Sequence, residues 1–289
     1  MDPQTLDPQA AYHRPGDLDA ALRLMAALRP TVLAGGTDLF PATQRPALTG
    51  PVLDITAIAG LSGIAETDGG VRIGAATRWS AIAGAPLPAA LEALRQAARE
   101  VGAVQIQNAG TIGGNLCNAS PAADGVPPLL ACGAEVELAS LRGRRRLPLA
   151  AFITGPRRTA LAPDEIMTAV ILPRAGLAGR SAFLKLGARR HLVISIAMAA
   201  VRVECAGGRI GRAAIAVGAC SAVARRLPAV EAALAGQPLE APVIDPAAVA
   251  AALAPIDDVR ASAEYRSLAA AELIGRALAM AIGPEREAA

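Results

Sequence analysis

The chain has 289 residues and a net charge of only +3, a length that suits two packed domains. Aromatic residues make up 2% of it and no long basic run occurs, so nucleic acid is disfavoured as a partner. Apolar residues make up 53%, but the longest apolar run, 192–201, reaches only about half of the roughly 20 residues that a membrane-spanning helix needs, so no transmembrane segment is predicted.

In chain order, the first half combines short strands with amphipathic helices. Residues 1–11 contain two Asp and two Pro and no leader-like run, which favours a cytoplasmic location. Asp17 precedes apolar residues at helical spacing, which predicts an N-capped helix over 18–28. A buried strand at 31–34 then runs into Gly35 and Gly36. Further strands are predicted at 52–55, 71–75, 135–139 and 166–172, and a helix at 88–100.

A long stretch between these elements, residues 105–128, shows little periodicity. It is rich in Gly, Asn, Ser, Ala and Pro, and it mixes apolar residues with turn-forming ones. Long irregular segments in compact domains tend to be functional or disordered, and this mixture favours an ordered functional loop. The Pro/Gly-rich segment 173–179 is the predicted boundary between two domains.

The second half reads as α+β with an antiparallel sheet. Strand-like segments at 193–204 and 209–219 are joined by Gly207 and Gly208, which together predict a hairpin. Another strand is predicted at 181–186, and helices at 228–235, 246–253 and 262–280.

The four cysteines are spread widely and include no C-x-x-C pair, and the chain has only two histidines. A zinc or iron–sulfur site needs clustered soft ligands, so no metal site is predicted. Cys117 has no histidine near it in sequence, and a reactive thiol needs an activating partner. We therefore predict no catalytic residue of the chain's own.

Lys185 is the one lysine among 28 basic residues that are otherwise arginine. This bias is most simply a habit of the genome, and the lysine a chance survival. A second interpretation is a site that needs a compact ammonium rather than a planar guanidinium. Composition leaves both interpretations open.

Two glycine-rich segments carry the main functional signal: Gly35-Gly36-Thr37-Asp38 after a strand, and Gly110-Thr111-Ile112-Gly113-Gly114-Asn115. Paired glycines let successive N–H groups turn toward one point and let a ligand approach the backbone closely. Each segment alone is more often a simple turn. Neither fits the G-x-G-x-x-G or P-loop patterns. Together they predict a diphosphate held mainly by neutral donors.

In their surroundings, these segments closely resemble the FAD-binding subunits of molybdenum hydroxylases, the family of xanthine dehydrogenase and carbon monoxide dehydrogenase flavoproteins. The resemblance extends over nearly the whole chain, in the family's order. It rests on LAGGTDL (33–39), RIGAATRWSAIA (72–83), NAGTIGGNLCNASPAAD (108–124), FLKLGARR (183–190) and DVRASAEYR (258–266).

The resemblance implies a two-lobed FAD-binding domain of the vanillyl-alcohol-oxidase (PCMH) type at 1–175, with lobes of about 1–56 and 57–175. A smaller α+β C-terminal domain would follow at 176–289. It also implies which positions contact FAD, with Lys185 on a family lysine and an apolar contact at Ile166 or Met167. The implied positions are Val32, Leu33, Ala34, Gly35, Gly36, Thr37, Asp38, Leu39, Gly110, Thr111, Ile112, Gly113, Gly114, Asn115, Asn118, Asp124, Ile166, Met167 and Lys185.

The resemblance further implies an electron-transfer role. FAD would take electrons from two [2Fe–2S] clusters on a small subunit, and a large subunit would carry the molybdopterin cofactor, in a dimer of heterotrimers. The flavin would pass electrons to NAD+ or another acceptor. GGTD in place of the GGHS of the carbon monoxide branch favours the xanthine dehydrogenase side. A self-sufficient FAD-dependent oxidase or dehydrogenase of the same fold stays open as the alternative.

Overall fold

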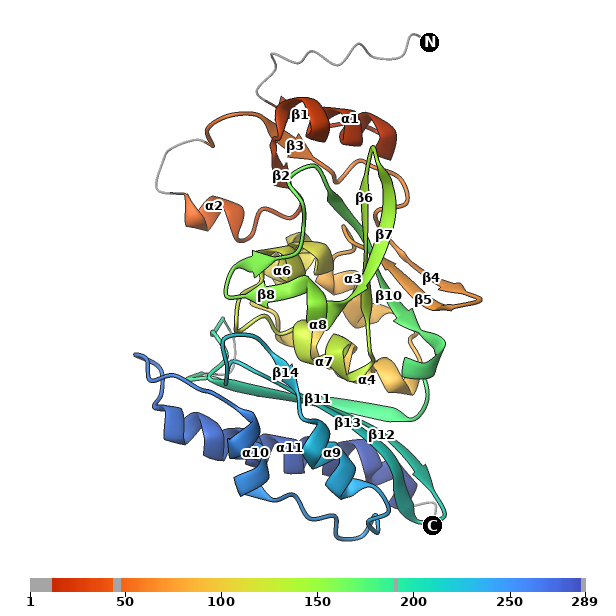
Figure 1. The fold of residues 1–289 in the computed structure, drawn as a ribbon, viewed down its shortest axis with the longest axis vertical. Coiled ribbons are helices and arrows are strands. Elements are labelled where there is room, and N and C mark those ends of the chain that lie inside the picture. The colour runs from red at the N-terminus through yellow and green to blue at the C-terminus, as the bar shows by residue number, and fades with distance from the viewer. Residues whose placement is uncertain (1–11, 44–47, 190–191, 287–289) are drawn as a thin grey trace.

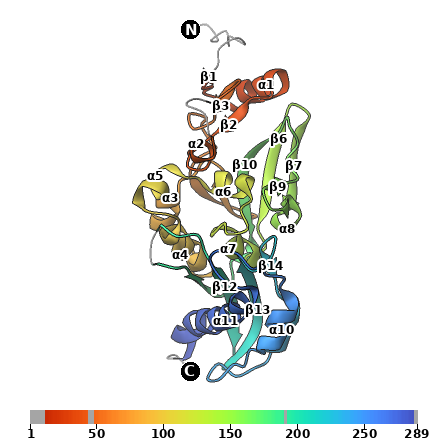
Figure 2. The same ribbon diagram turned by 90° about the vertical axis from the view of Figure 1, so that its left-hand side faces the viewer.

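A computed structural model describes residues 12–43, 48–189 and 192–286, arranged as three tiers stacked along the long axis (Figures 1 and 2). Segment 1–11, used above for the location, lies outside the described residues, as do Arg190 and His191 at the end of the FLKLGARR motif and just after it. No helix within the described ranges combines the length and the apolar character needed to cross a membrane.

The first tier is a small parallel sheet with a helix packed on it. Asp17 caps α1 (Leu18–Leu28), because its Oδ1 accepts the Ala20 N–H at 2.8 Å, as the sequence predicts. The sheet has the order β1-β3-β2 and both pairings are parallel, since α1 carries the chain back between β1 and β2. Its other elements are β1 (Tyr12–His13), β2 (Thr31–Leu33), α2 (Leu39–Ala42) and β3 (Val52–Asp54).

The second tier is an antiparallel sheet of order β4-β5-β10-β6-β7 with helices on its inner face. The central strand β10 (Ile166–Pro173) reads IMTAVILP and is buried along nearly its whole length. Its inward side chains pack with Trp79 and Phe152 in the main core. The flanking strands are β4 (Ile64–Thr67), β5 (Gly70–Gly74), β6 (Glu135–Ser140) and β7 (Gly143–Pro148).

The helices of this tier are short. The predicted helix at 88–100 is a 3-10 turn (Ala89–Leu91) followed by α4 (Glu92–Glu100). The stretch 105–128, expected as an irregular loop, instead forms most of three helices. It lacks a clear period because each helix is only one or two turns long. The remaining elements are α3 (Trp79–Gly84), α5 (Val104–Ala109), α6 (Ile112–Asn118), α7 (Val126–Ala131), α8 (Leu149–Phe152), β8 (Ile153–Gly155) and β9 (Arg158–Thr159).

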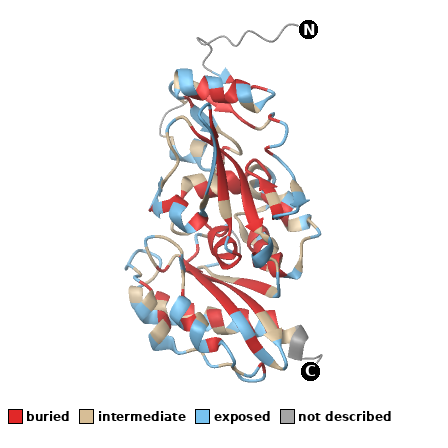
Figure 3. Ribbon diagram, turned by 45° about the vertical axis from the view of Figure 1, so that its right-hand side comes forward, coloured by how far each residue is buried: buried red, intermediate tan, exposed pale blue. Residues whose placement is uncertain are grey.

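The third tier is the antiparallel sheet β11-β12-β13-β14, covered on both faces. Along β12 (Ala197–Ala206), alternate residues pack against α11 on one side and against α4 and α7 on the other, so the strand is a continuous apolar run (Figure 3). A Gly207-Gly208 turn joins β12 to β13 as predicted. The other elements are β11 (Arg180–Leu186), β13 (Arg209–Gly218), β14 (Arg225–Arg226), α9 (Pro228–Leu234), α10 (Pro246–Ala252) and α11 (Ala263–Arg286).

The fold is therefore α+β, with two lobes followed by a smaller α+β unit. The predicted domain boundary at residue 175 falls in the 3-10 turn Arg174–Gly176 that precedes β11. Two strand predictions are wrong in part. The strand predicted as buried at 31–34 is β2, whose Thr31 and Val32 are exposed because it lies at the edge of its small sheet. The strand predicted from 193 is β12, which begins at Ala197. Residues 192–194 instead line the cleft described below, where Leu192 and Ile194 stay more than half exposed.

Candidate functional site

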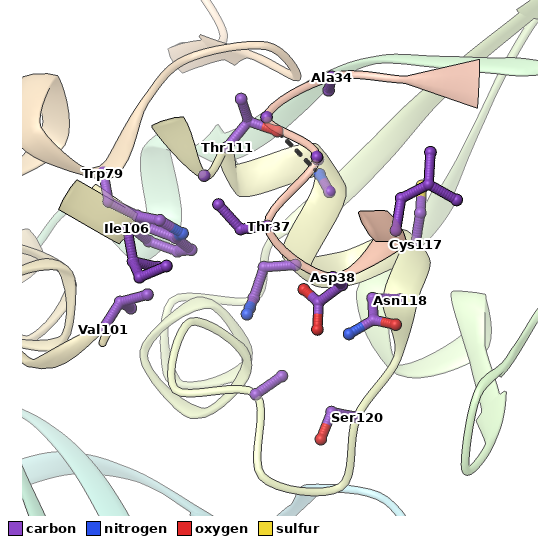
Figure 4. Close-up of a pocket in the computed structure, with 18 of the residues that line it drawn as sticks. Ala34, Thr37, Asp38, Trp79, Val101, Ile106, Thr111, Cys117, Asn118 and Ser120 are labelled. Atoms are coloured by element: carbon purple, nitrogen blue, oxygen red, sulfur yellow. Dashed lines mark hydrogen bonds between the residues drawn. The ribbon is translucent and has the colours of Figure 1, made fainter. Parts of the chain in front are cut away.

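A cleft of about 670 Å³ opens between the tiers, and both glycine-rich segments line it (Figure 4). The turn after β2 forms one wall and α6 forms the facing wall. Figure 4 shows Thr37 and Asp38 on that turn, opposite Cys117 and Asn118 of α6. Segments from all three tiers meet here, although they lie far apart in the sequence.

The first turn presents free backbone donors. Gly36 has φ +69°, a left-handed conformation that glycine adopts without strain. The N–H groups of Gly35, Gly36, Thr37 and Asp38 have no acceptor within the described residues. Successive free N–H groups at a turn form a concave donor site that suits an acceptor-rich ligand such as a phosphate.

The two glycine segments touch each other directly. A Cβ added at Gly35 would lie 2.1 Å from the carbonyl oxygen of Ala109 and 2.8 Å from Cα of Gly110. A Cβ at Gly110 would lie 3.3 Å from Oγ1 of Thr37. Glycine is therefore required at residue 35 so that the two backbones can cross, and the crossing brings both turns to one cleft.

The second segment contributes differently from the expected N–H cradle. The N–H groups of Ile112 and Gly113 donate to the Thr77 and Ala75 carbonyls at 3.0 and 2.8 Å, so they are already used. The Gly114 N–H donates to Thr111 Oγ1 at 3.1 Å, which leaves the Thr111 hydroxyl proton free for another acceptor (Figure 4, dashed). This segment therefore offers a ligand side-chain hydrogen-bond donors and space, rather than a row of free backbone N–H groups.

The room comes from Gly114, which lines the cleft. A Cβ there would meet a single atom of another residue within 4 Å, Thr111 Oγ1 at 3.0 Å, so a larger side chain would extend into the cleft. Beside it, the Oδ1 atom of Asn115 is buried without a hydrogen-bond partner in the described part of the chain. An orphaned buried amide oxygen costs about 1–3 kcal/mol, so it marks a place for a donor on a ligand.

Asp124 and Lys185 form a buried ion pair behind the cleft wall. Lys185 Nζ lies 2.8 Å from Asp124 Oδ2 and donates to the Glu100 carbonyl at 3.0 Å, while Ser195 Oγ donates to Asp124 Oδ1 at 2.6 Å. Burial raises the pKa of the Asp124 carboxyl, and the Lys185 ammonium opposes that rise. Because Lys185 and Ser195 come from the third tier, the pair joins that tier to the cleft.

Most of the residues that the sequence analysis assigns to the cofactor line this cleft. The exceptions are Leu33, which lies in β2, Ile112, which is fully buried in the core, and Lys185, which lies behind Asp124. Further lining residues escape sequence reasoning because no local motif marks them. They include Val101, Ile106, Arg157 and Glu165, whereas Trp79 and Ser120 also line the cleft but lie within the family motifs 72–83 and 108–124.

The far wall of the cleft is apolar, and the thiol that lines the cleft is not ionised. Ile166 and Met167 line it from β10, both nearly fully buried. Cys117 also lines the cleft, but burial raises the pKa of its thiol to about 12, so it is no thiolate at neutral pH. Glu165 is held by Arg145 through two contacts of 2.6 and 2.7 Å, which lower the pKa of its carboxyl.

This arrangement fits a flavin dinucleotide on three counts. Free N–H groups and the Thr111 hydroxyl face the cleft, Gly114 keeps space beside them, and Asn115 carries an unused acceptor. Diphosphate oxygens accept such donors, and an apolar wall suits an aromatic ring. The chain would hold and orient the group, and a bound flavin would supply the electron-transfer chemistry.

Replacing Gly35 with alanine is expected to lower the free energy of unfolding by about 1–3 kcal/mol, since the new Cβ overlaps the Ala109 carbonyl. Urea unfolding measures the change. Gly16→Ala is the matched control, because a Cβ at Gly16 meets nothing within 4 Å. Equal stability of Gly35→Ala and the parent chain would show that the two backbones do not cross this closely.

Two family models match the chain. The FAD binding domain in molybdopterin dehydrogenase matches residues 7–175, and the CO dehydrogenase flavoprotein C-terminal domain matches residues 182–281. The first covers more than half of the chain, and the two follow each other in the order that the resemblance implies.

Individual relatives agree with these models. The nicotinate dehydrogenase FAD-subunit of Eubacterium barkeri is 40% identical over 185 residues, which cover 62% of each chain. The nicotine 6-hydroxylase medium subunit of Paenarthrobacter nicotinovorans is 34% identical over 94% of this chain and 96% of its own. A solved carbon monoxide dehydrogenase chain from Hydrogenophaga pseudoflava superimposes with a TM-score of 0.85 at 30% identity, covering 94% of this chain and 96% of that one. The chain therefore belongs to the family of FAD-binding flavoprotein subunits of molybdenum hydroxylases.

Proposed function

We propose that the chain is the electron-transfer flavoprotein of a molybdenum hydroxylase, and that it receives electrons from [2Fe–2S] clusters of a partner subunit and delivers them through FAD to an acceptor. The observation that supports this most directly is the contact between the two glycine segments at one donor-lined cleft. Of the acids that line the cleft, Asp124 and Glu165 are each paired with a cation, and Asp38 lies on the turn that we assign to the diphosphate.

In this proposal, each part of the cleft has one task. The turn Gly35–Asp38 and the Thr111 hydroxyl hold the FAD diphosphate, and Gly114 keeps the space for it. Asn115, Asn118 and Asp124 orient polar groups of the nucleotide, and Ile166 and Met167 exclude water from one face of the ring. Bound FAD would accept electrons one at a time and release two together.

The proposed partners are a large molybdopterin subunit and a small [2Fe–2S] subunit, joined as a dimer of heterotrimers. Two relatives are themselves an FAD-subunit and a medium subunit, which supports a multisubunit complex. Among its branches we favour a xanthine dehydrogenase-like complex with NAD+ as acceptor, because the first turn reads GGTD. These two relatives are subunits of a nicotinate dehydrogenase and a nicotine 6-hydroxylase, so similarity to them does not identify one substrate. In this proposal, the molybdopterin subunit selects the compound that is hydroxylated.

Purified chain is expected to show the absorbance spectrum of oxidised flavin, or to acquire it on addition of FAD. A tagged chain expressed in its native host should also co-purify with subunits that contain molybdenum and iron–sulfur clusters. Folded protein that stays colourless with FAD would contradict the cofactor. Flavin-loaded chain that oxidises a substrate to completion without partners would instead favour a self-sufficient enzyme.

A further inference from the structure

Arg157 is held at the edge of the cleft by unusual backbone. It lies in the turn between β8 and β9 with φ +58°, and its N–H donates to the carbonyl of Ala119 at 2.8 Å. Ala119, at the end of α6, has φ +46°. Left-handed conformations cost non-glycine residues about 1–2 kcal/mol each, so the fold accepts strain at both ends of this hydrogen bond.

Arg157 makes a side-chain hydrogen bond to Asn118 and no ion pair within the described part of the chain. Among the described residues that line the cleft Arg157 is the single cation, and the partner of its guanidinium is the Asn118 amide rather than a carboxylate. Of the three acids that line the cleft, Asp124 and Glu165 are paired with Lys185 and Arg145, and Asp38 on the opposite wall makes no ion pair within the described residues. A cation that the protein does not neutralise at a ligand cleft fits a negative charge on the ligand.

Arg157 also determines what Asn118 offers. Its guanidinium Nη1 donates to Asn118 Oδ1. Arginine has donors and no acceptor, so the amide oxygen must face it, and the amide NH2 is left to donate elsewhere. Asn118 lies four residues beyond Gly114, about 6 Å further along α6, so this pair meets a different part of the nucleotide from the diphosphate.

Arg157 lines the same cleft as Ile166 and Met167, the residues assigned to the ring. We infer that Arg157 lies beside the flavin ring, as a positioning and electrostatic residue that makes the cleft bind reduced flavin more tightly than oxidised flavin. This inference rests on the proposed function. Uptake of two electrons and one proton converts the neutral oxidised ring into an anion. The cation of Arg157 and the donor that it imposes on Asn118 stabilise the anion more than the neutral ring, which raises the midpoint potential.

The test is a spectroelectrochemical titration of the full chain loaded with FAD, together with the Kd for oxidised FAD. Arg157→Gly removes the side chain and suits the left-handed backbone. We expect it to weaken binding of reduced FAD about tenfold more than binding of oxidised FAD, which lowers the midpoint potential by about 30 mV. Arg157→Lys keeps the charge and should retain most of the parent potential, whereas Arg157→Gln should resemble Arg157→Gly.

Arg158→Ala is the matched control, because Arg158 is exposed in the same hairpin and does not line the cleft. It should leave the potential unchanged. The inference would be overturned if Arg157→Gly and Arg157→Gln both kept the midpoint potential of the parent chain. It would also be overturned if Arg158→Ala lowered the midpoint potential as much as Arg157→Gly. If the parent chain itself fails to bind FAD, the proposed function fails instead, so the two failures are distinguishable.

Discussion

Replacing Gly114 with valine is expected to abolish FAD retention while the chain stays folded. The new side chain meets little protein and extends into the space beside Thr111, where we place the diphosphate. Overpacking a fitted site costs about 1–3 kcal/mol, and the upper end corresponds to an affinity loss of about a hundredfold. Flavin content after gel filtration and a fluorescence titration with FAD measure the effect.

Gly275→Val is the control for that change. Gly275 also lies within a helix and a Cβ there meets nothing within 4 Å, but it is in α11, remote from the cleft. Valine has a somewhat higher helix propensity than glycine, and this small gain applies to both variants, so their stabilities should be similar. Normal flavin content in Gly114→Val would refute the position assigned to the diphosphate.

Replacing Lys185 with methionine is expected to be the most destabilising single change considered. It leaves the Asp124 carboxylate buried without its ammonium partner, which costs about 3–5 kcal/mol. Urea unfolding at several pH values measures it. The double variant Lys185→Met, Asp124→Asn removes both charges, and we expect it to recover much of the loss.

The stability lost in Lys185→Met should depend on pH in a defined direction. Burial already raises the pKa of Asp124, and loss of Lys185 raises it further above the unfolded value of about 3.9. For an acid with a raised folded pKa, stability is fully present below the unfolded pKa and is lost as pH rises through the folded pKa. Lys185→Met should therefore approach the parent stability near pH 4 and fall furthest behind at pH 8. A deficit independent of pH would argue against the buried pair.

Local signals in the sequence predicted individual elements well. The cap at Asp17 predicts the start of α1, the apolar run at 166–172 predicts β10, and the paired glycines at 207–208 predict the long hairpin of the third tier. Each of these elements is specified by residues close together in the chain. The same holds for the two glycine segments, whose composition alone indicates a close approach of backbone.

What the sequence could not predict depends on contacts between distant residues. The parallel pairing of β1 with β3 joins segments about forty residues apart, and no local sequence pattern indicates that the two strands run parallel. The short helices α6 and α7 are stabilised by packing of their apolar residues into the core, and they are too short to show a helical period in the sequence. Arg157 and Ser195 belong to segments without a motif, so their places at the cleft and at Asp124 emerge only from the fold.

The function of Lys185 illustrates the difference. Its rarity in composition suggested a site that needs a compact ammonium, and the family resemblance suggested contact with FAD. In the fold its Nζ is enclosed by Asp124 and the Glu100 carbonyl, where a planar guanidinium would need more room. We therefore expect Lys185 to act on a bound cofactor through Asp124.

A comparison of affinities for FAD and riboflavin tests most directly whether the two crossing turns hold a diphosphate. Flavin-free chain would be titrated calorimetrically with each compound, since riboflavin has the same ring and lacks the diphosphate. We expect one FAD per chain and binding at least a hundredfold tighter than that of riboflavin, a difference of about 2.7 kcal/mol. Equal affinities, or folded chain that binds neither compound, would contradict the site.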